Sequence, residues 1–160
     1  MSLVLGIDPG TAITGYGFVR QHADDRLEAV AYGVITTPAK IPAHERLVRI
    51  YEELNELLLL HRPERAAVEK LFFQRNVTTA IAVGQARGVV MLALAQAGLQ
   101  PAEYTPNEIK LAVAGYGSAG KRQVQEMVRM LLQLDAIPRP DDAADALAVA
   151  ITHLHTNRYN

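Results

Sequence analysis

Residues 3–17, with the sequence LVLGIDPGTAITGYG, join a short apolar run to a turn and to the start of a second strand. The run ends at Asp8, and Pro9 and Gly10 follow directly, so a carboxylate lies where a buried strand stops and the chain turns. A carboxylate in such a place costs several kcal/mol unless it meets a cation or becomes neutral. The placement of Asp8 therefore indicates a metal site.

Three further acids occupy similarly apolar surroundings. Glu69 closes the apolar stretch 66–68, and Asp142 and Asp145 interrupt a C-terminal segment that is otherwise almost uncharged. Any one of these acids alone is more simply explained as a helix cap or a surface ion pair. The four together favour a divalent cation, because acids on core elements need a charged partner.

Spacing alone does not decide which acids of the C-terminal segment face the metal. Asp142 and Asp145 are three residues apart and share a helical face, but Asp141 and Asp145, four apart, share one too. Asp141 follows Pro140 and is well placed to cap the helix by accepting from free backbone N–H groups. This favours Asp142 as the ligand.

The composition fits one globular domain. The chain has 160 residues, of which 49% are hydrophobic and 21% charged, and we expect a domain over residues 1–156 with a short tail at 157–160. It contains no cysteine, which excludes a disulfide framework, a thiolate metal site and a cysteine nucleophile. No apolar run approaches the roughly 20 residues of a membrane span, so we expect a cytoplasmic protein with no membrane partner. The net charge of −1 neither favours nor excludes nucleic acid.

Hydrophobic periodicity predicts an α/β fold. Strands are expected over residues 3–8, 14–20, 27–36, 65–69 and 100–105, and helices over 43–61, 77–97, 107–114, 118–134 and 142–155. The first three strands form a meander, and the strand, helix, strand order that follows indicates a parallel βαβ unit. The prediction is a five-stranded mixed sheet with helices on both faces.

This architecture suits the proposed metal site. Sites in such sheets form where strands end, and Asp8 and Glu69 end two strands that could be neighbours. Clustered carboxylates without cysteine suit Mg²⁺ or Mn²⁺, which prefer oxygen ligands. Two such ions about 3.5–4 Å apart are the usual arrangement for cutting phosphodiesters.

The motifs GIDPGT at residues 6–11 and TGYG at residues 14–17 resemble those of RuvC-type Holliday-junction resolvases, members of the RNase H-like nuclease superfamily. The resemblance covers nearly the whole chain. It continues through Val68-Glu69, Phe72, GQARG at 84–88, Thr105-Pro106, Ile109-Lys110, GSA at 117–119, Lys121, and DAADALA at 142–148.

The resemblance implies an RNase H-like fold and a homodimer that nicks two opposing strands of a four-way DNA junction symmetrically, leaving 5′-phosphate and 3′-hydroxyl ends. It implies that Asp8, Glu69, Asp142 and Asp145 are the catalytic residues and hold two Mg²⁺ or Mn²⁺ ions in each subunit. Some relatives have histidine in place of Asp142. Cleavage next to paired thymines and cooperation with the RuvA–RuvB branch-migration complex are also expected from the family.

The loop after Glu69 carries the first set of candidate DNA contacts. Phe72 and Phe73 are followed by Arg75 and Asn76, which places aromatic, cationic and amide groups next to a metal ligand. Unstacked bases gain about 1–3 kcal/mol each by stacking on such rings. At least one phenylalanine is expected in the core, and the resemblance favours Phe72 for the junction centre.

Three basic residues form the second set of candidate DNA contacts. Lys121 and Arg122 open a predicted helix, where a cation is unfavourable unless an anion such as phosphate lies there. Lys110 is assigned to substrate handling by the resemblance, since a solvated lysine is the simpler explanation of its position.

Three alternatives compete with the resolvase. The segment 115–121, GYGSAGK, nearly matches a P-loop, but Arg122 stands where Ser or Thr would bind Mg²⁺. The segment 6–17 also resembles the phosphate-binding turn of actin-like ATPases and sugar kinases, which need two such domains around a nucleotide. A catalytically inactive junction-binding module with the same fold is the third.

Overall fold

The computed structural model describes residues 2–70 and 77–157. One sheet contains five strands in the order β3-β2-β1-β4-β5. The strands are β1 Ser2–Asp8, β2 Ile13–Gln21, β3 Leu27–Thr36, β4 Arg65–Glu69 and β5 Ala102–Tyr104. The helices are α1 Ala43–His61, α2 Val77–Gln96, α3 Pro106–Ala114, α4 Lys121–Leu131 and α5 Asp141–Thr156.

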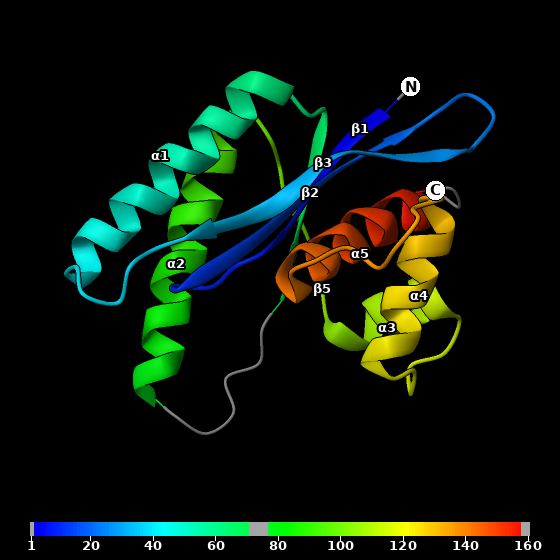
Figure 1. Ribbon diagram of the computed structural model, residues 1–160. Coiled ribbons are helices and arrows are strands. Elements are labelled where there is room, and N and C mark those ends of the chain that lie inside the picture. The colour runs from blue at the N-terminus through cyan, green and yellow to red at the C-terminus, as the bar shows by residue number, and fades with distance from the viewer. Residues whose placement is uncertain (1, 71–76, 158–160) are drawn as a thin grey trace.

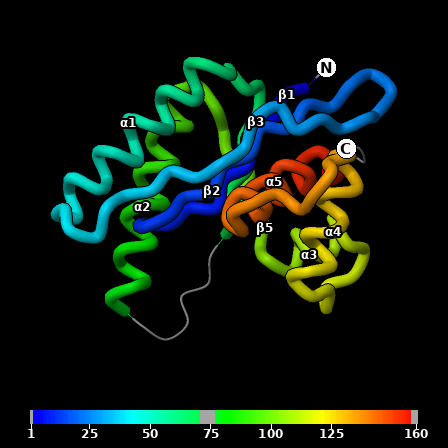
Figure 2. Tube along the Cα trace, viewed as in Figure 1, coloured from blue at the N-terminus to red at the C-terminus, as the bar shows by residue number. Residues whose placement is uncertain are grey.

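The sheet is mixed, as the sequence predicts. β1, β2 and β3 pair antiparallel as a meander, whereas β4 runs parallel to β1 and β5 runs parallel to β4. Figure 2 shows the path of the chain, in which the meander comes first and α5 returns last against the sheet. The five-stranded mixed sheet of the RNase H-like prediction is confirmed.

Helices cover both faces of the sheet. α1 and α2 lie on one side and α3, α4 and α5 on the other (Figure 1). Side chains alternate along each strand, so Leu5 and Ile7 of β1 pack with α1 and α2, and Val4 packs with α3, α4 and α5. By the same alternation Asp8 points to the face that α5 covers, and so does Glu69, two residues after Ala67 of that core.

α5 lies unusually close to the sheet because glycines face it. A Cβ at Gly6 would stand 2.1 Å from the carbonyl oxygen of Ala146, and one at Gly15 would stand 2.0 Å from that of Asp142. Neither distance is possible for a real side chain, so only glycine permits this approach. The backbone of the first turn of α5 therefore rests directly on β2, beside the end of β1.

α4 and β5 are shorter than the sequence predicts, and α3 begins one residue earlier. α4 begins at Lys121 rather than at residue 118, because Gly120 has extended backbone and serves as its N-cap. It ends at Leu131, since Gln133 takes a positive φ of 54°. β5 is only three residues long, and α3 starts where the Thr105 hydroxyl accepts a hydrogen bond from the backbone N–H of Glu108.

The expectation that no apolar run reaches the length of a membrane span is wrong. Within the residues the structure describes, α2 is 20 residues long and contains an 18-residue window with a mean hydropathy of 1.5, enough to cross a membrane by length and composition alone. Part of this apolar character serves the core, because Ala86, Val90, Ala93 and Leu94 are buried against α1 and the sheet.

Candidate active site

Three carboxylates meet at the end of β1. Asp8 is the last residue of β1, and Asp142 and Asp145 lie in the first turns of α5. One oxygen atom from each of the three lies within 4.8 Å of the others, a group that could hold a metal ion. The close backbone contact between α5 and Gly15 brings the two helix acids to the strand acid.

Glu69 stands beside this group. β4 pairs with β1 in register, Ile7 opposite Val68, so Asp8 and Glu69 are the next residues on neighbouring parallel strands. The Glu69 carboxylate lies close enough to Asp8 for its charge to raise the pKa of Asp8. Glu69 lies outside the 4.8 Å group, but it lines the same cavity as Asp145.

The electrostatics of the cluster fit a cation. Burial and then the charge of Glu69 raise the pKa of Asp8 to about 9, with Asp145 and Asp142 adding to the shift. Burial also raises the pKa of Asp145 to about 6, although nearby Lys121 opposes this change. Carboxylates held together in this way repel one another unless they are protonated or share a positive charge. An all-oxygen donor set of this kind suits a hard divalent ion.

Asp141 is not the helix cap that the sequence predicts. The N-cap of α5 is Pro140, and no side chain caps the helix. The Asp141 carboxylate instead accepts from the Lys121 ammonium at 3.2 Å and from the Gln125 amide at 3.3 Å. These bonds lower the pKa of Asp141. Asp141 therefore ties α5 to α4, while Asp142 joins the acidic group.

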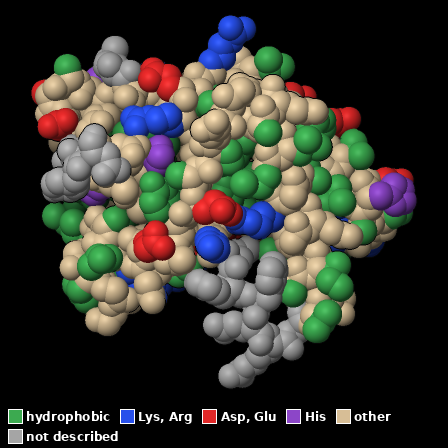
Figure 3. All heavy atoms as spheres, turned by 180° about the vertical axis from the view of Figure 1, so that it is seen from behind, with side chains coloured by type: hydrophobic (Ala, Val, Ile, Leu, Met, Phe, Trp, Pro, Cys, Tyr) green, Lys and Arg blue, Asp and Glu red, His purple; other side chains and the backbone are tan. Residues whose placement is uncertain are grey.

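Two of the predicted DNA-contacting cations lie at the cluster. A cavity of about 320 Å³ is lined by Glu69 and Asp145 together with Lys110 and Lys121. Figure 3 shows acidic and basic side chains next to each other near the centre of one face. Arg122 does not line this cavity, and its guanidinium lies 3.8 Å from Glu126.

The predicted contacts Phe72, Phe73, Arg75 and Asn76 lie outside the described residues. They remain predictions.

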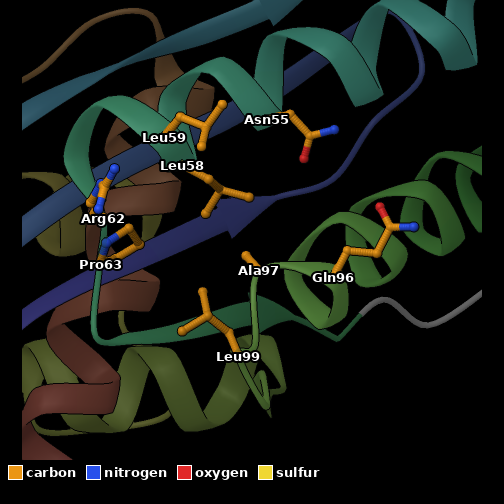
Figure 4. A pocket seen from close by; sticks show the side chains of 8 residues that line it. All are labelled: Asn55, Leu58, Leu59, Arg62, Pro63, Gln96, Ala97 and Leu99. Carbon is orange, nitrogen blue, oxygen red and sulfur yellow. The ribbon is translucent and has the colours of Figure 1, made fainter.

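A second cavity, of about 520 Å³, has no acidic lining. It lies between the C-terminal ends of α1 and α2, where Leu58 and Leu59 face Ala97 and Leu99 (Figure 4). Arg62, Gln96 and Asn55 give it a few polar groups. None of the predicted site residues lines it.

Arg87, which sequence reasoning missed, lies next to Glu69 in the structure. The Arg87 guanidinium donates from Nη1 to the backbone carbonyl oxygen of Glu69 at 2.6 Å, and its Nη2 pairs with the Glu103 carboxylate. The available signal was that Arg87 is the one charged residue in the sequence of α2.

Comparisons with known proteins identify the family and agree with the fold. The family described as "Crossover junction endodeoxyribonuclease RuvC" matches residues 4–153. A protein of that name from Syntrophomonas wolfei is 56% identical over 97% of this chain and 90% of its own length. One from Chloroflexus aurantiacus is 57% identical over 95% of this chain and 92% of its own.

Solved structures give the same result. The structure described as "T. thermophilus RuvC in complex with Holliday junction substrate" superposes with a TM-score of 0.91 at 38% identity, covering 99% of this chain and 96% of that one. The resolvase of yeast mitochondria, at 12% identity and a TM-score of 0.72, shares the fold. The chain belongs to the RuvC family of crossover junction endodeoxyribonucleases.

Proposed function

We propose that this protein resolves Holliday junctions by metal-dependent, symmetric nicking of two opposing strands, leaving 5′-phosphate and 3′-hydroxyl ends. Asp8, Glu69, Asp142 and Asp145 are the proposed catalytic ligands of two Mg²⁺ or Mn²⁺ ions in each active site. The observation that carries the proposal is the convergence of carboxylates from β1 and α5 within 4.8 Å in a chain of this family.

The residues of the site have separate tasks in this proposal. When bound, the ions supply Lewis-acid stabilisation of the scissile phosphate and activation of water. Asp8, whose pKa is about 9 in the metal-free protein, holds a proton at neutral pH and must release it to become a ligand. The buried, like-charged neighbours that raise this pKa are also what make the site favour a divalent cation.

Lys110 and Lys121 are the proposed phosphate contacts. Both line the cavity that also has Glu69 and Asp145 in its lining, so a phosphate there would lie between the two lysine side chains and the acidic group. Lys121 is also the first residue of α4, where backbone N–H groups favour an anion. Arg122, exposed and directed to Glu126, is proposed to contact DNA farther from the cleavage point.

Symmetric nicking requires two sites, and we propose that a homodimer supplies them. α2 exposes large apolar side chains, with Val77 74%, Ile81 58% and Leu92 51% accessible. A twofold contact between two copies of this face would cover them. Cooperation with RuvA–RuvB and a cytoplasmic location are proposed from family membership.

The alternatives find less support. The P-loop-like segment 115–121 lies between α3 and α4 rather than between a strand and a helix. The matching family and the relatives described above are crossover junction endodeoxyribonucleases, which favours the resolvase over an actin-like ATPase or a sugar kinase. A binding module without catalysis would have no use for a cluster of acids that repel one another.

A synthetic four-way junction tests the proposal directly. The wild-type protein and Asp8→Asn are incubated with the junction and Mg²⁺, and products are resolved by denaturing electrophoresis. We expect both proteins to bind the junction and only the wild type to nick opposing strands. Binding without nicks by either protein would indicate a junction-binding module, and tight ATP binding without junction affinity would indicate the kinase-like alternative.

A further inference from the structure

Arg87 is a charged residue in an otherwise uncharged, apolar helix. α2 is otherwise uncharged and apolar enough to resemble a membrane span, yet the Arg87 side chain is only 16% exposed. Removing a guanidinium from water is costly unless its N–H groups find acceptors. The position therefore needs a structural reason.

The hydrogen-bond acceptor and the ion-pair partner of Arg87 lie on two neighbouring strands. Nη1 donates to the backbone carbonyl oxygen of Glu69, the last residue of β4, and Nη2 pairs with the carboxylate of Glu103 on β5. In the parallel pairing of these strands Val68 is opposite Glu103 and Glu69 is opposite Tyr104. The planar guanidinium thus joins the ends of two strands through two separate nitrogen atoms.

This link acts on Glu69, the proposed ligand that lies outside the 4.8 Å group. Asp8, Asp142 and Asp145 are fixed by β1, by the glycine contacts and by α5. Glu69 lies at the end of β4, and α2 covers the opposite face of the sheet from α5 (Figure 1). Arg87 therefore bonds the backbone of Glu69 from α2, while the Glu69 side chain points to the α5 side, next to Asp8.

We propose that Arg87 is a positioning residue that fixes the backbone of Glu69 so that its carboxylate meets Asp8, and that Glu103 orients the Arg87 guanidinium. This inference rests on the proposed function, in which Glu69 holds a metal ion. Groups that orient metal ligands typically change metal affinity or activity by about 10- to 100-fold when they are replaced. A displacement of 1 Å at a reacting centre can cost about 100-fold.

Arg87→Lys is the central test, because lysine keeps the charge but cannot bond two acceptors in a fixed fork. We expect single-turnover nicking at saturating junction to fall about 10- to 100-fold. The Mg²⁺ concentration for half-maximal rate and the dissociation constant for Mn²⁺, measured by calorimetry on DNA-free protein, are expected to rise. Junction affinity without metal should change less than about twofold. Arg49→Lys, at an exposed arginine of α1, is the matched control and should change none of these.

Glu103→Gln tests the second half of the inference. It removes the carboxylate partner and leaves the bond between Arg87 and the Glu69 carbonyl, so its effect should have the same sign and be smaller. The double variant Arg87→Lys/Glu103→Gln should be no worse than Arg87→Lys alone, because both changes act on one link. If the losses of nicking rate in Arg87→Lys and Glu103→Gln multiplied fully in the double variant, the role given to Glu103 would be overturned.

Glu69→Gln separates failure of this inference from failure of the proposed function. Loss of nicking in Glu69→Gln together with wild-type rate and Mn²⁺ affinity in Arg87→Lys would refute the positioning role alone. Wild-type nicking by Glu69→Gln would refute the proposed ligand set itself. A general structural role would instead lower thermal stability and junction affinity along with the rate, and that result would also overturn the inference.

Discussion

α5 and α2 are both apolar helices packed on the same sheet, yet they differ in how much of their surface is covered. Every residue of α5 from Ala143 to Leu154 is buried except Asp145. In α2 only Ala86, Val90, Ala93 and Leu94 are buried, and several large apolar side chains remain exposed. Hydropathy alone does not distinguish these helices.

The neighbours of the two helices explain the difference. α5 lies between the sheet and the pair α3 and α4, so protein surrounds it on all sides. α2 packs on the sheet and α1 but has no helix on its outer side within the described residues. α5 is therefore covered within one chain, whereas the apolar face of α2 is the surface that the proposed homodimer contact would cover.

The largest expected effect is a difference in nicking rate between variants of Asp142, which belongs to the acidic group, and of Asp141, which faces α4. Asp142→Asn should lower the nicking rate on the order of 10³-fold, because it removes a charge from the acidic group. Asp141→Asn should stay within about fivefold of the wild type, since Asp141 forms an exposed ion pair with Lys121. Rates are measured on a four-way junction with Mg²⁺. Equal losses in the two variants would contradict the assignment of Asp142 as the ligand.

A pair of glycine substitutions sharpens the comparison of packing. Gly6→Ala should destabilise the fold by about 2–4 kcal/mol, because its Cβ would collide with the backbone of α5. Gly88→Ala on α2, where a Cβ meets nothing within 4 Å, should stabilise the fold by about 0.5–1 kcal/mol. Urea denaturation of both variants gives the free energies of unfolding. Similar losses at both positions would mean that α2 is as closely packed as α5.

The exposed face of α2 is tested by its effect on association. Ile81→Lys should raise the dissociation constant of the homodimer by about tenfold or more, because a charge would enter the apolar contact. Leu111→Lys on α3 is the control, since both side chains are 58% exposed in the monomer. Sedimentation equilibrium measures both. A dimer unaffected by Ile81→Lys, or weakened equally by the control, would place the interface elsewhere.

The smallest effect concerns the stability of the metal-free protein. The pKa of Asp8 is about 9 in the fold and near 3.8 as a free group, so between these pH values the folded state binds the extra proton. Stability therefore falls as the pH rises from about 4 to 9. Asp8→Asn should reduce this fall and raise the melting temperature at pH 8 by about 2–5 °C.

Scanning calorimetry with a chelator measures the effect, and Mg²⁺ should stabilise the wild type much more than the variant. A wild-type melting temperature that rises with pH over this range would contradict the origin given for the shift.

The sequence predicted most of the fold because its signals were local. Alternating apolar residues around 3–36 gave the meander, and Pro63 and Gly98 marked helix ends close to those observed. The candidate ligands were identified because acids in apolar surroundings are rare, and Asp8, Asp142 and Asp145 do lie together. The prediction that they converge also depended on the family resemblance, since no local pattern relates residue 8 to residue 145.

The features that sequence reasoning missed depend on contacts between distant segments. Asp141 was predicted to be a cap because it follows Pro140, whereas its actual partners, Lys121 and Gln125, lie on another helix that no local pattern relates to it. The role of Arg87 depends on Glu69 and Glu103, which are separated from it by 18 and 16 positions in the chain. The exposed apolar face of α2 could not be predicted, because periodicity shows which residues are apolar but not which of them pack against other parts of the chain.

The glycine contacts under α5 have a consequence for how this enzyme can vary. The separation between the strand acid and the helix acids is set where main chain touches main chain, at Gly6 and Gly15, so it does not depend on rotamers of the surrounding aliphatic side chains. Leucine, isoleucine and valine can thus be exchanged throughout the interior with a change in stability, while the distances between the acids of the active site stay the same.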